Sequence, residues 1–394
     1  MMERVALGLR LLGTFLRERP SQFALSVVLA AFGILCATAI LWLRDTIETH
    51  AARQAEGIDL VVGAKGSALQ NVLAAIYHVD VPSGNIPLAE VEAIAARPDV
   101  AYAIPIALGD SVAGARIVGT TAAFLDLYGA RAERGTRELA PMNALLGAQV
   151  ARRTGLSVGD RFIGVHGLSG AGEAHDEHPY TVTGILAPTG RVVDQLVLTA
   201  LESVWIVHEG HTAATEPEVS FALIGARGPA AMTTLPRALN ARPNLQAAVP
   251  ALEAARLLTA FAWVVALVQF FALVMLAAAL ASLVGALMQA VTRREPDLAM
   301  LQAVGARPWQ LSLLLSLETL ALVVFAALLA ALTLAALPAV ADRVAGTGLP
   351  WSAVDGISWF VLVVALTLLA ALVATLPALR RALRVDVVEQ LVRR

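Results

Sequence analysis

The chain alternates between long apolar runs and mixed segments. The first apolar run goes from Phe23 to Leu43 and lies between Arg19 and Arg44. Its length is about the 20 residues that cross a bilayer. It is too long for the apolar part of a signal peptide, and no small-x-small cleavage site follows it. The pattern therefore predicts a first membrane-spanning helix.

Three further apolar runs fall in the last third of the chain. They extend from Leu257 to Val291, from Leu311 to Leu337 and from Ile357 to Leu376. At about 1.5 Å per residue, the run from Leu257 would be about 50 Å long as a helix. A hydrocarbon core is only about 30 Å thick, so we expect this helix to project beyond the membrane as a stalk.

The segment between the first and second apolar runs has the pattern of a folded α+β domain, in one or two lobes. Strand-like alternation and helical spacing follow each other along it. The strand patterns lie at Ile58–Val62, Ala115–Gly119, Tyr180–Leu186 and Val219–Ile224, and the helical patterns at Leu88–Arg97, Asn143–Thr154 and Pro229–Ala241.

Composition agrees with a membrane protein. Hydrophobic residues make up 58% and charged residues 15%, against about 45–50% and about 25% in soluble domains. The mean hydropathy is +0.70. These values exclude a purely soluble chain and a disordered one. The net charge of −2 gives no indication of a nucleic-acid partner.

Two scarce residue types limit the chemistry. Cys36 is the single cysteine, so neither an intrachain disulfide nor a cysteine-based zinc site can form. Lys65 is the single lysine, and its surroundings, Gly63–Ser67, do not fit a Walker A loop. We expect no catalytic site on this chain, and any ATP that the system uses would be bound by another chain.

The arginines predict the orientation of the apolar runs. They gather before the first run, between the second and third, and after the fourth: Arg4, Arg10, Arg17, Arg19; Arg293, Arg294, Arg307; Arg380, Arg381, Arg384, Arg393, Arg394. The loop between the third and fourth runs carries only Arg343. The positive-inside rule therefore places both termini in the cytoplasm.

The predicted fold class is an α-helical membrane protein with four transmembrane helices and a large α+β extracytoplasmic domain between helices one and two. The expected segments are a cytoplasmic amphipathic helix (1–20), transmembrane helix 1 (21–44), the extracytoplasmic domain (45–255), transmembrane helix 2 with its stalk (256–292), a cytoplasmic helix (293–309), transmembrane helix 3 (310–338), a short outer loop (339–356), transmembrane helix 4 (357–377) and a cytoplasmic tail (378–394).

The cytoplasmic segment has the signals of a short helix. Pro296 suits a first helical turn, and Gly305 suits the left-handed residue after a last turn. Leu298, Leu301 and Val304 share one face. Such a helix either rests at the membrane interface beside its arginines or docks in a groove of a partner protein.

This segment resembles the loop between spans two and three of FtsX-like (MacB-type) ABC transporter permeases. Those typically read Arg-x-x-Glu-Ile-Ala-Ile-Leu-Arg-Ala-Leu-Gly-Ala, and this chain departs by Asp297 and Gln302. Further similarities are Glu318 in the third span, Pro377–Ala382 in the tail, and Leu145–Asp160 and Val182–Leu186 in the outside domain. The resemblance covers nearly the whole chain and is weakest between residues 65 and 140.

The resemblance implies the permease subunit of an ABC transporter in a bacterial inner membrane, with a MacB-like periplasmic domain. A separate ABC ATPase would bind ATP and magnesium, and its motion would be transmitted across the membrane for export or release of a substrate. The residues expected to couple to it are Arg294, Asp297, Leu298, Leu301, Val304 and Gly305. Implied partners are a second permease copy, as homodimer or related heterodimer, and a periplasmic adaptor or binding protein.

Polar and small residues inside the spans are further candidates. Glu318 and Gln269 are polar groups within apolar runs, which are costly there and often functional. Small residues at four-residue spacing allow close helix packing, although high alanine content gives the same spacing by chance. They are Gly33 and Ala37 in the first span and Ala277, Ala281 and Gly285 in the second.

Two histidine pairs in the outside domain leave other functions open. His175 with His178, and His208 with His211, each stand beside carboxylates and could bind zinc if the pairs converge. Polar hairpin tips are the alternative interpretation. A transmembrane regulator of a periplasmic hydrolase and a zinc-handling system therefore remain alternatives to export.

Overall fold

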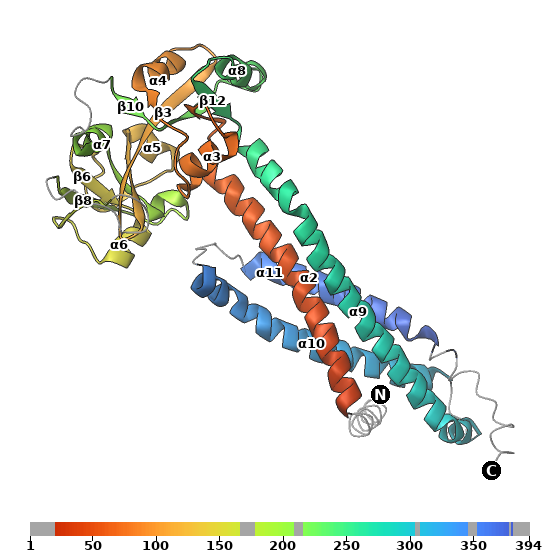
Figure 1. The fold of residues 1–394 in the computed structure, drawn as a ribbon. Coiled ribbons are helices and arrows are strands. Elements are labelled where there is room, and N and C mark those ends of the chain that lie inside the picture. The colour runs from red at the N-terminus through yellow and green to blue at the C-terminus, as the bar shows by residue number, and fades with distance from the viewer. Residues whose placement is uncertain are drawn as a thin grey trace. The chain divides into compact units, whose positions relative to one another are not determined.

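The computed structural model describes residues 20–165, 178–208, 216–303, 308–345, 353–377 and 380. The chain divides into two compact units (Figure 1). Residues Met1–Glu48 and Phe261–Arg394 form one, the helical unit, and Thr49–Ala260 form the other, the α/β unit. The division falls inside helix α2 (Pro20–Gln54) and inside helix α9 (Pro250–Ala303). The bounds of the nine predicted segments remain predictions.

A single large sheet organises the α/β unit. In the described part, ten strands follow the order β12-β1-β11-β3-β4-β9-β6-β8-β5, with β7 beside β8, and β2 and β10 form a separate pair. The strands are β1 (Leu60–Ala64), β2 (Ile86–Pro87), β3 (Val100–Val112), β4 (Ala115–Thr120), β5 (Ala132–Gly135), β6 (Asn143–Leu146), β7 (Arg161–Phe162), β8 (Tyr180–Leu186), β9 (Val197–Ala200), β10 (Glu218–Val219), β11 (Phe221–Ala226) and β12 (Leu245–Ala248).

Strand β3 joins the two halves of this sheet. Its first half pairs with β11, where Ile106 lies opposite Phe221. Its second half pairs with β4, and the register shifts between Leu108 and Ser111. Such an irregularity bends a strand and increases its twist. One continuous strand therefore carries both halves of the domain.

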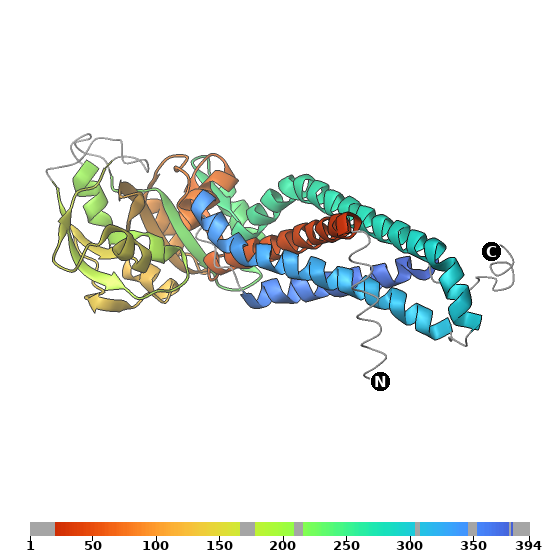
Figure 2. The same cartoon turned by 90° about the horizontal axis from the view of Figure 1, so that it is seen from below.

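Helices cover both faces of the sheet (Figures 1 and 2). They are α3 (Ala68–Val72), the π-helix η1 (Leu73–Tyr77), α4 (Leu88–Ala95), α5 (Ala122–Leu127), α6 (Ala148–Thr154), the 3-10 helix η2 (Val192–Gln195), α7 (Leu201–His208) and α8 (Ala231–Asn240). Side chains alternate along β11: Phe221 packs with Ile76 and Phe124 from η1 and α5, whereas Ala222 packs with Leu235 from α8. The alternation divides the domain's core between the two faces.

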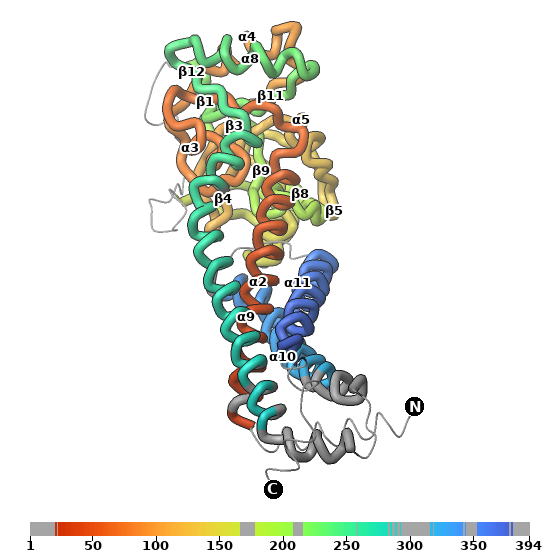
Figure 3. The backbone as a smooth tube through the Cα atoms, turned by 90° about the vertical axis from the view of Figure 1, so that its right-hand side faces the viewer, coloured from red at the N-terminus to blue at the C-terminus, as the bar shows by residue number. Residues whose placement is uncertain are grey.

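The helical unit contains parts of α2 and α9 together with α10 (Pro308–Ala345) and α11 (Ala353–Ala374) (Figure 3). In the described residues, four stretches are long and apolar enough to cross a membrane: Phe23–Gln54, Pro250–Ser282, Thr319–Ala341 and Ala353–Ala374. Their shared core contains Ile34, Ala279, Ala326 and Val363, one from each helix. The four apolar helices predicted from the pattern are therefore present.

Three local predictions were wrong. Residues Asn143–Thr154, predicted as one helix, form β6 and then α6. The run Leu145-Leu146 pairs with β9, and a Cβ on Gly147 would lie 2.3 Å from the Val193 carbonyl oxygen. The pairing of Asn143–Leu146 with β8 and β9 keeps these residues extended, so the helix begins only after Gly147. The predicted strand Val219–Ile224 is split between β10 and β11.

The third difference concerns the cytoplasmic segment. Helix α9 continues without a break through Pro296 to Ala303, so the residues up to Ala303 are not a separate short helix. The helix-start signal of a proline is local, whereas here the preceding residues are already helical.

Candidate functional site

Most of the predicted coupling residues lie on one helix. Arg294, Asp297, Leu298 and Leu301 belong to the last part of α9. Val304 and Gly305 lie outside the described residues. The four described residues therefore share a helix, and the role of all six residues in coupling remains a prediction.

The small residues predicted for helix packing divide into two groups. Gly33 is buried on α2, and a Cβ there would lie 3.3 Å from the Cβ of Leu276 on α9. Ala37 is half-buried on the same helix. The stripe on α9 is exposed at its three positions, Ala277, Ala281 and Gly285. Gly33 therefore serves packing within this chain, whereas the α9 stripe is not covered by the residues that the structure describes.

Polar groups within the apolar helices include a contact that sequence reasoning missed. The hydroxyls of Ser26 on α2 and Ser282 on α9 lie 2.7 Å apart in a hydrogen bond. Hydrogen bonds of this kind hold helices together where water is absent. Gln269 is exposed on α9, and Glu318 lies within α10.

The histidine pairs are only partly described. His178 is half-buried just before β8, and α7 ends at His208. His175 and His211 lie outside the described residues. Within the described ranges, no group of three or more histidine, cysteine, aspartate or glutamate side chains could hold a metal ion. Zinc binding by the two pairs stays a prediction.

The end of α2 is fixed in the α/β unit by hydrogen bonds, at a site we call the α2 junction (Gln54, Glu56, Tyr128, Arg191 and Val192). The Gln54 side chain is 1% exposed, and its Oε1 accepts the Val192 backbone N–H at 2.7 Å. A buried amide that lost this partner would be costly. The contact ties the last turn of α2 to a segment 138 residues further along the chain.

Arg191 completes the α2 junction. One guanidinium nitrogen donates to the Leu127 carbonyl oxygen at 3.2 Å, and another donates to the Glu56 carbonyl oxygen at 3.0 Å. The guanidinium carbon lies 4.4 Å from the centre of the Tyr128 ring. Burial raises the pKa of Tyr128, so its ring stays neutral beneath the cation. Arg191 thereby connects three parts of the α/β unit.

Asp194 positions Arg191 by organising the turn before it. Its carboxylate accepts the backbone N–H of Thr189 at 2.9 Å, the hydroxyl of Thr189 at 2.8 Å and the backbone N–H of Gly190 at 2.8 Å. Gly190 has a φ of 71°, which favours glycine. The sequence marks this segment only as a turn, because the partners of Arg191 lie far away in the chain.

The turn that follows α2 is also set by close packing. Gly57 has a φ of 84°, and a Cβ there would lie 2.8 Å from Leu127. Glycine after a last helical turn is a common helix end. The chain then turns into strand β1, so α2 leads directly into the sheet.

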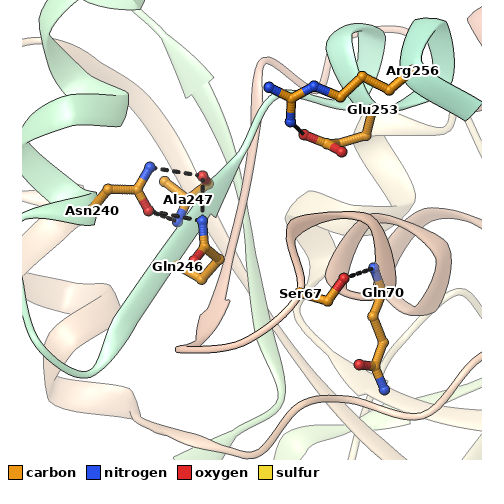
Figure 4. Close-up of polar contacts among 7 residues, drawn as sticks. All are labelled: Ser67, Gln70, Asn240, Gln246, Ala247, Glu253 and Arg256. Atoms are coloured by element: carbon orange, nitrogen blue, oxygen red, sulfur yellow. Dashed lines mark hydrogen bonds and ion pairs between the residues drawn. The ribbon is translucent and has the colours of Figure 1, made fainter.

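The strand that leads into α9 is fixed by hydrogen bonds at the α9 junction (Asn240, Gln246, Ala247, Glu253 and Arg256; Figure 4). The Asn240 amide donates to the Ala247 carbonyl oxygen at 3.0 Å and accepts the Ala247 N–H at 2.9 Å. Gln246 Nε2 donates to Asn240 Oδ1 at 3.0 Å. Within the first turn of α9, Glu253 pairs with Arg256 at 2.6 Å. The end of α2 is thus bonded directly to the α/β unit, and the strand that leads into α9 is bonded to the end of α8.

Two protein-family models match the sequence. Residues 23–242 match the MacB-like periplasmic core domain, and residues 269–387 match the C-terminal region of FtsX-like permeases. The chain belongs to the MacB/FtsX-type family of ABC permeases. Members of this family are membrane components that work with a separate ABC ATPase subunit. The resemblance drawn from the loop and domain motifs is therefore confirmed.

Solved structures give weaker similarities. The periplasmic region of MacB from Actinobacillus actinomycetemcomitans aligns with a TM-score of 0.31 at 10% identity, covering 50% of this chain and 92% of that one. The extracellular domain of the noncanonic ABC-type transporter YknZ from Gram-positive bacteria aligns with a TM-score of 0.33 at 10% identity, covering 48% and 98%. No curated protein is significantly similar to the chain. The family assignment stands on the two family models.

Proposed function

We propose that this permease transmits the motion of a cytoplasmic ATPase to its α/β unit, for export or release of a substrate. The ATPase docks at residues 295–308, and two permease copies form the membrane part. The termini lie in the cytoplasm and the α/β unit lies in the periplasm of a bacterial inner-membrane protein. ATP and magnesium are bound by the partner subunit.

The observation that supports this mechanism most is the pair of junctions. A helix can move a domain only if its end is firmly attached to that domain. The α2 junction attaches α2 through Gln54 and Arg191, and the first turn of α9 follows a strand that Asn240 holds in place. Displacement of either helix along its axis would therefore act directly on the sheet.

The composition of the apolar helices also favours transmission over conduction. A pore for a polar substrate needs polar side chains that face a common space. Polar side chains are few along the described spans, and Ser26 and Ser282 bond to each other. The polar side chains of the described spans are therefore too few to line a path for a polar substrate.

The docking site is tested by Leu301→Asp, with Gln302→Asp as the matched control. If Leu301 faces an apolar groove of the ATPase, the aspartate loses several kcal/mol of binding because its charge is buried without a partner. The control adds the same charge one residue away on the helix. The measurements are pull-down of the ATPase and ATP hydrolysis in nanodiscs. Full binding and hydrolysis by Leu301→Asp would contradict docking at this segment.

The orientation is tested with a cysteine at Gln302 in a Cys36→Ala background. We expect an impermeant thiol reagent to label it only after the cells are opened, because the arginine distribution places this loop inside. A cysteine at Val158, which is 43% exposed in the α/β unit, should be labelled once the outer membrane is permeable. Labelling of the Gln302 cysteine in cells with an intact inner membrane would reverse the topology.

The substrate class is tested by co-purification from membranes. An adaptor and an outer-membrane channel would indicate export. A periplasmic cell-wall hydrolase would indicate the regulator, and zinc bound in a fixed ratio would indicate metal handling. The export and release proposal requires that the hydrolase be absent from the purified complex.

A further inference from the structure

A histidine lies next to the α2 junction, one helical turn before Gln54. His50 belongs to the part of α2 that the α/β unit contains, and its ring is half-buried. Its Nε2 lies 3.3 Å from Nε2 of Gln54. The same Gln54 amide accepts the Val192 backbone N–H through Oε1 at 2.7 Å. The ring, the amide and the backbone N–H therefore form one continuous chain of hydrogen bonds.

The Val192 backbone fixes the direction of both hydrogen bonds. A backbone N–H can only donate, so the Gln54 oxygen must face Val192 and the Gln54 nitrogen must face His50. That nitrogen carries two hydrogens and can only donate as well. His50 Nε2 must therefore accept, which requires that it carry no proton. The contacts assign His50 as a neutral ring with its proton on Nδ1.

A proton on His50 Nε2 would set two donors against each other. The Gln54 amide can turn over and accept from the ring, but its nitrogen then faces the Val192 N–H. One of the two hydrogen bonds is lost in either case. His50 Nδ1 is buried and has no hydrogen-bond partner among the described residues, so a charged ring gains no bond on its other side. Buried donors without acceptors are costly.

The charges on α2 itself do not offset a positive ring. Within the described ranges, no carboxylate forms an ion pair with His50. The Glu48 carboxylate pairs with Arg44 instead. Arg53 stands three residues after His50, which makes the two side chains neighbours on the helix, and its positive charge opposes a second one on the ring.

The titratable groups of the elements packed on the end of α2 are engaged elsewhere. Tyr77 of η1 donates its hydroxyl to the Ala51 carbonyl oxygen at 3.5 Å. Arg191 donates to two carbonyl oxygens and lies over the Tyr128 ring. The Asp194 carboxylate accepts hydrogen bonds from the turn before Arg191. None of these groups is therefore placed to receive the additional proton's N–H.

We propose that the α2 junction is a pH-sensitive attachment that opens when His50 takes up a proton. An exposed histidine titrates near pH 6.5, within the physiological range. Above that pH, the neutral ring accepts from Gln54 and holds the amide in place. Below it, the opened junction binds the proton more readily than the closed one, so the closed state loses stability as the pH falls. This response belongs to the α/β unit, whereas its effect on transmission rests on the proposed function.

The attachment is tested on the full chain in nanodiscs by hydrogen exchange at pH 7.5, 6.5 and 5.5. The measured quantity is the protection factor of the Val192 amide, which is corrected for the intrinsic pH dependence of exchange. We expect this protection to fall by up to about tenfold between pH 6.5 and 5.5, since one proton changes an equilibrium by at most about tenfold per pH unit. Amides of β11, which lies between β1 and β3, report opening of the whole unit and serve as the internal reference.

Two substitutions separate the titrating ring from the hydrogen bond that it accepts. His50→Gln offers an amide oxygen as acceptor and cannot titrate, so the protection of Val192 should not depend on pH. Gln54→Glu offers a carboxylate that accepts from Val192 and from a charged ring, so the protection should rise as the pH falls from 7.5 to 6.5. His178→Gln, at a half-buried histidine before β8, is the matched control and should behave like the wild-type chain.

Two results would overturn the proposal. One is a Val192 amide in the wild-type chain whose protection does not change with pH relative to β11. The other is an equal fall in the wild-type chain and in His50→Gln, which would assign the response to another group.

The effect on transmission has a separate measurement. At pH 5.5, ATP-driven substrate release should be weaker in the wild-type chain than in His50→Gln, with ATPase docking equal in both. If Val192 opens as expected while release is the same in the two proteins, transmission through α2 is contradicted and the pH-sensitive attachment stands.

Discussion

The two units of the chain place the same residue types in opposite surroundings. In the α/β unit, Leu60 and Leu223 are 0% exposed. In the helical unit, Leu328 and Leu332 are 62% and 73% exposed. The α/β unit hides its apolar side chains as a domain in water must. The helical unit turns them outward, which is stable only where the solvent is itself apolar. Exposure of a leucine therefore has a different meaning in each unit.

A second contrast lies within the helical unit. The apolar window of α2 is 39% buried by its own chain, and that of α9 is 11% buried. Helix α2 contributes Ile34 to the shared core, whereas α9 exposes Phe270 and Leu273. Helix α9 therefore leaves the larger apolar surface uncovered by the described part of the chain.

The first test removes the same atoms from both units. Leu223→Ala in β11 should destabilise the α/β unit by about 2–5 kcal/mol, because it leaves a cavity in a packed core. Leu328→Ala in α10 should change stability by about 0.5 kcal/mol or less. Denaturant unfolding in nanodiscs, followed by a probe in each unit, measures both. An equal loss of stability in Leu223→Ala and Leu328→Ala would contradict the expected difference between the two units.

The second test introduces a charge instead. Leu328→Arg should cost about 2.5–3.5 kcal/mol of membrane insertion if this position lies near the bilayer centre. Val158→Arg, at an exposed position of the α/β unit, should be neutral because water already surrounds it. Insertion is measured by membrane fractionation and glycosylation mapping. Normal insertion of Leu328→Arg would show that α10 does not face lipid there.

The third test sharpens the contrast between α2 and α9. Gly33→Val should weaken α2 packing by about 1–3 kcal/mol, because the added Cβ lies 3.3 Å from Leu276 and the neighbour must shift. Gly285→Val meets nothing within 4 Å in the chain, so unfolding of the single chain should not change. Loss of the dimer by Gly285→Val in mass photometry would locate the second copy on this stripe, and an unchanged dimer would exclude the stripe.

The fourth test concerns the α2 junction. Arg191→Met should destabilise the α/β unit by about 1–3 kcal/mol, since two carbonyl oxygens lose their donor. It should also reduce the substrate release driven by each ATP, while docking of the ATPase is unchanged. Arg152→Met, which removes an exposed arginine of α6, is the matched control. A variant that is destabilised yet fully coupled would show that Arg191 serves the fold alone.

The last test concerns the dependence of stability on pH through His78, which follows η1 and is 5% exposed. The pKa of His78 is lowered to about 3 in the folded α/β unit, whereas an exposed histidine titrates near 6.5. Between these values the unfolded chain binds the proton more readily, so stability falls as the pH falls from about 6.5 towards 3. The slope is at most about 1.4 kcal/mol per pH unit. His78→Gln should remove this part of the slope, and identical slopes in the two proteins would contradict a buried neutral imidazole.

The sequence alone determined the features that depend on local composition and period. The four apolar helices follow from run length, because a bilayer fixes the number of residues needed to cross it. The lack of a Walker A loop around Lys65 follows from the residues themselves. The family followed from the segment Arg294–Ala306 and the domain motifs, which are also short and local.

Only the tertiary structure decided what distant parts of the chain do to each other. Leu145 lies in a strand because β9 pairs with it, although its own surroundings suggest a helix. From the sequence, Arg191 is only a residue of a turn. In the folded chain it donates hydrogen bonds to the carbonyl oxygens of Leu127 in α5 and of Glu56 after α2. Ile76 of η1 and Val118 of β4 lie in one buried core although they are far apart in the sequence. In each case the deciding partner lies at least 38 residues away, where no local pattern records it.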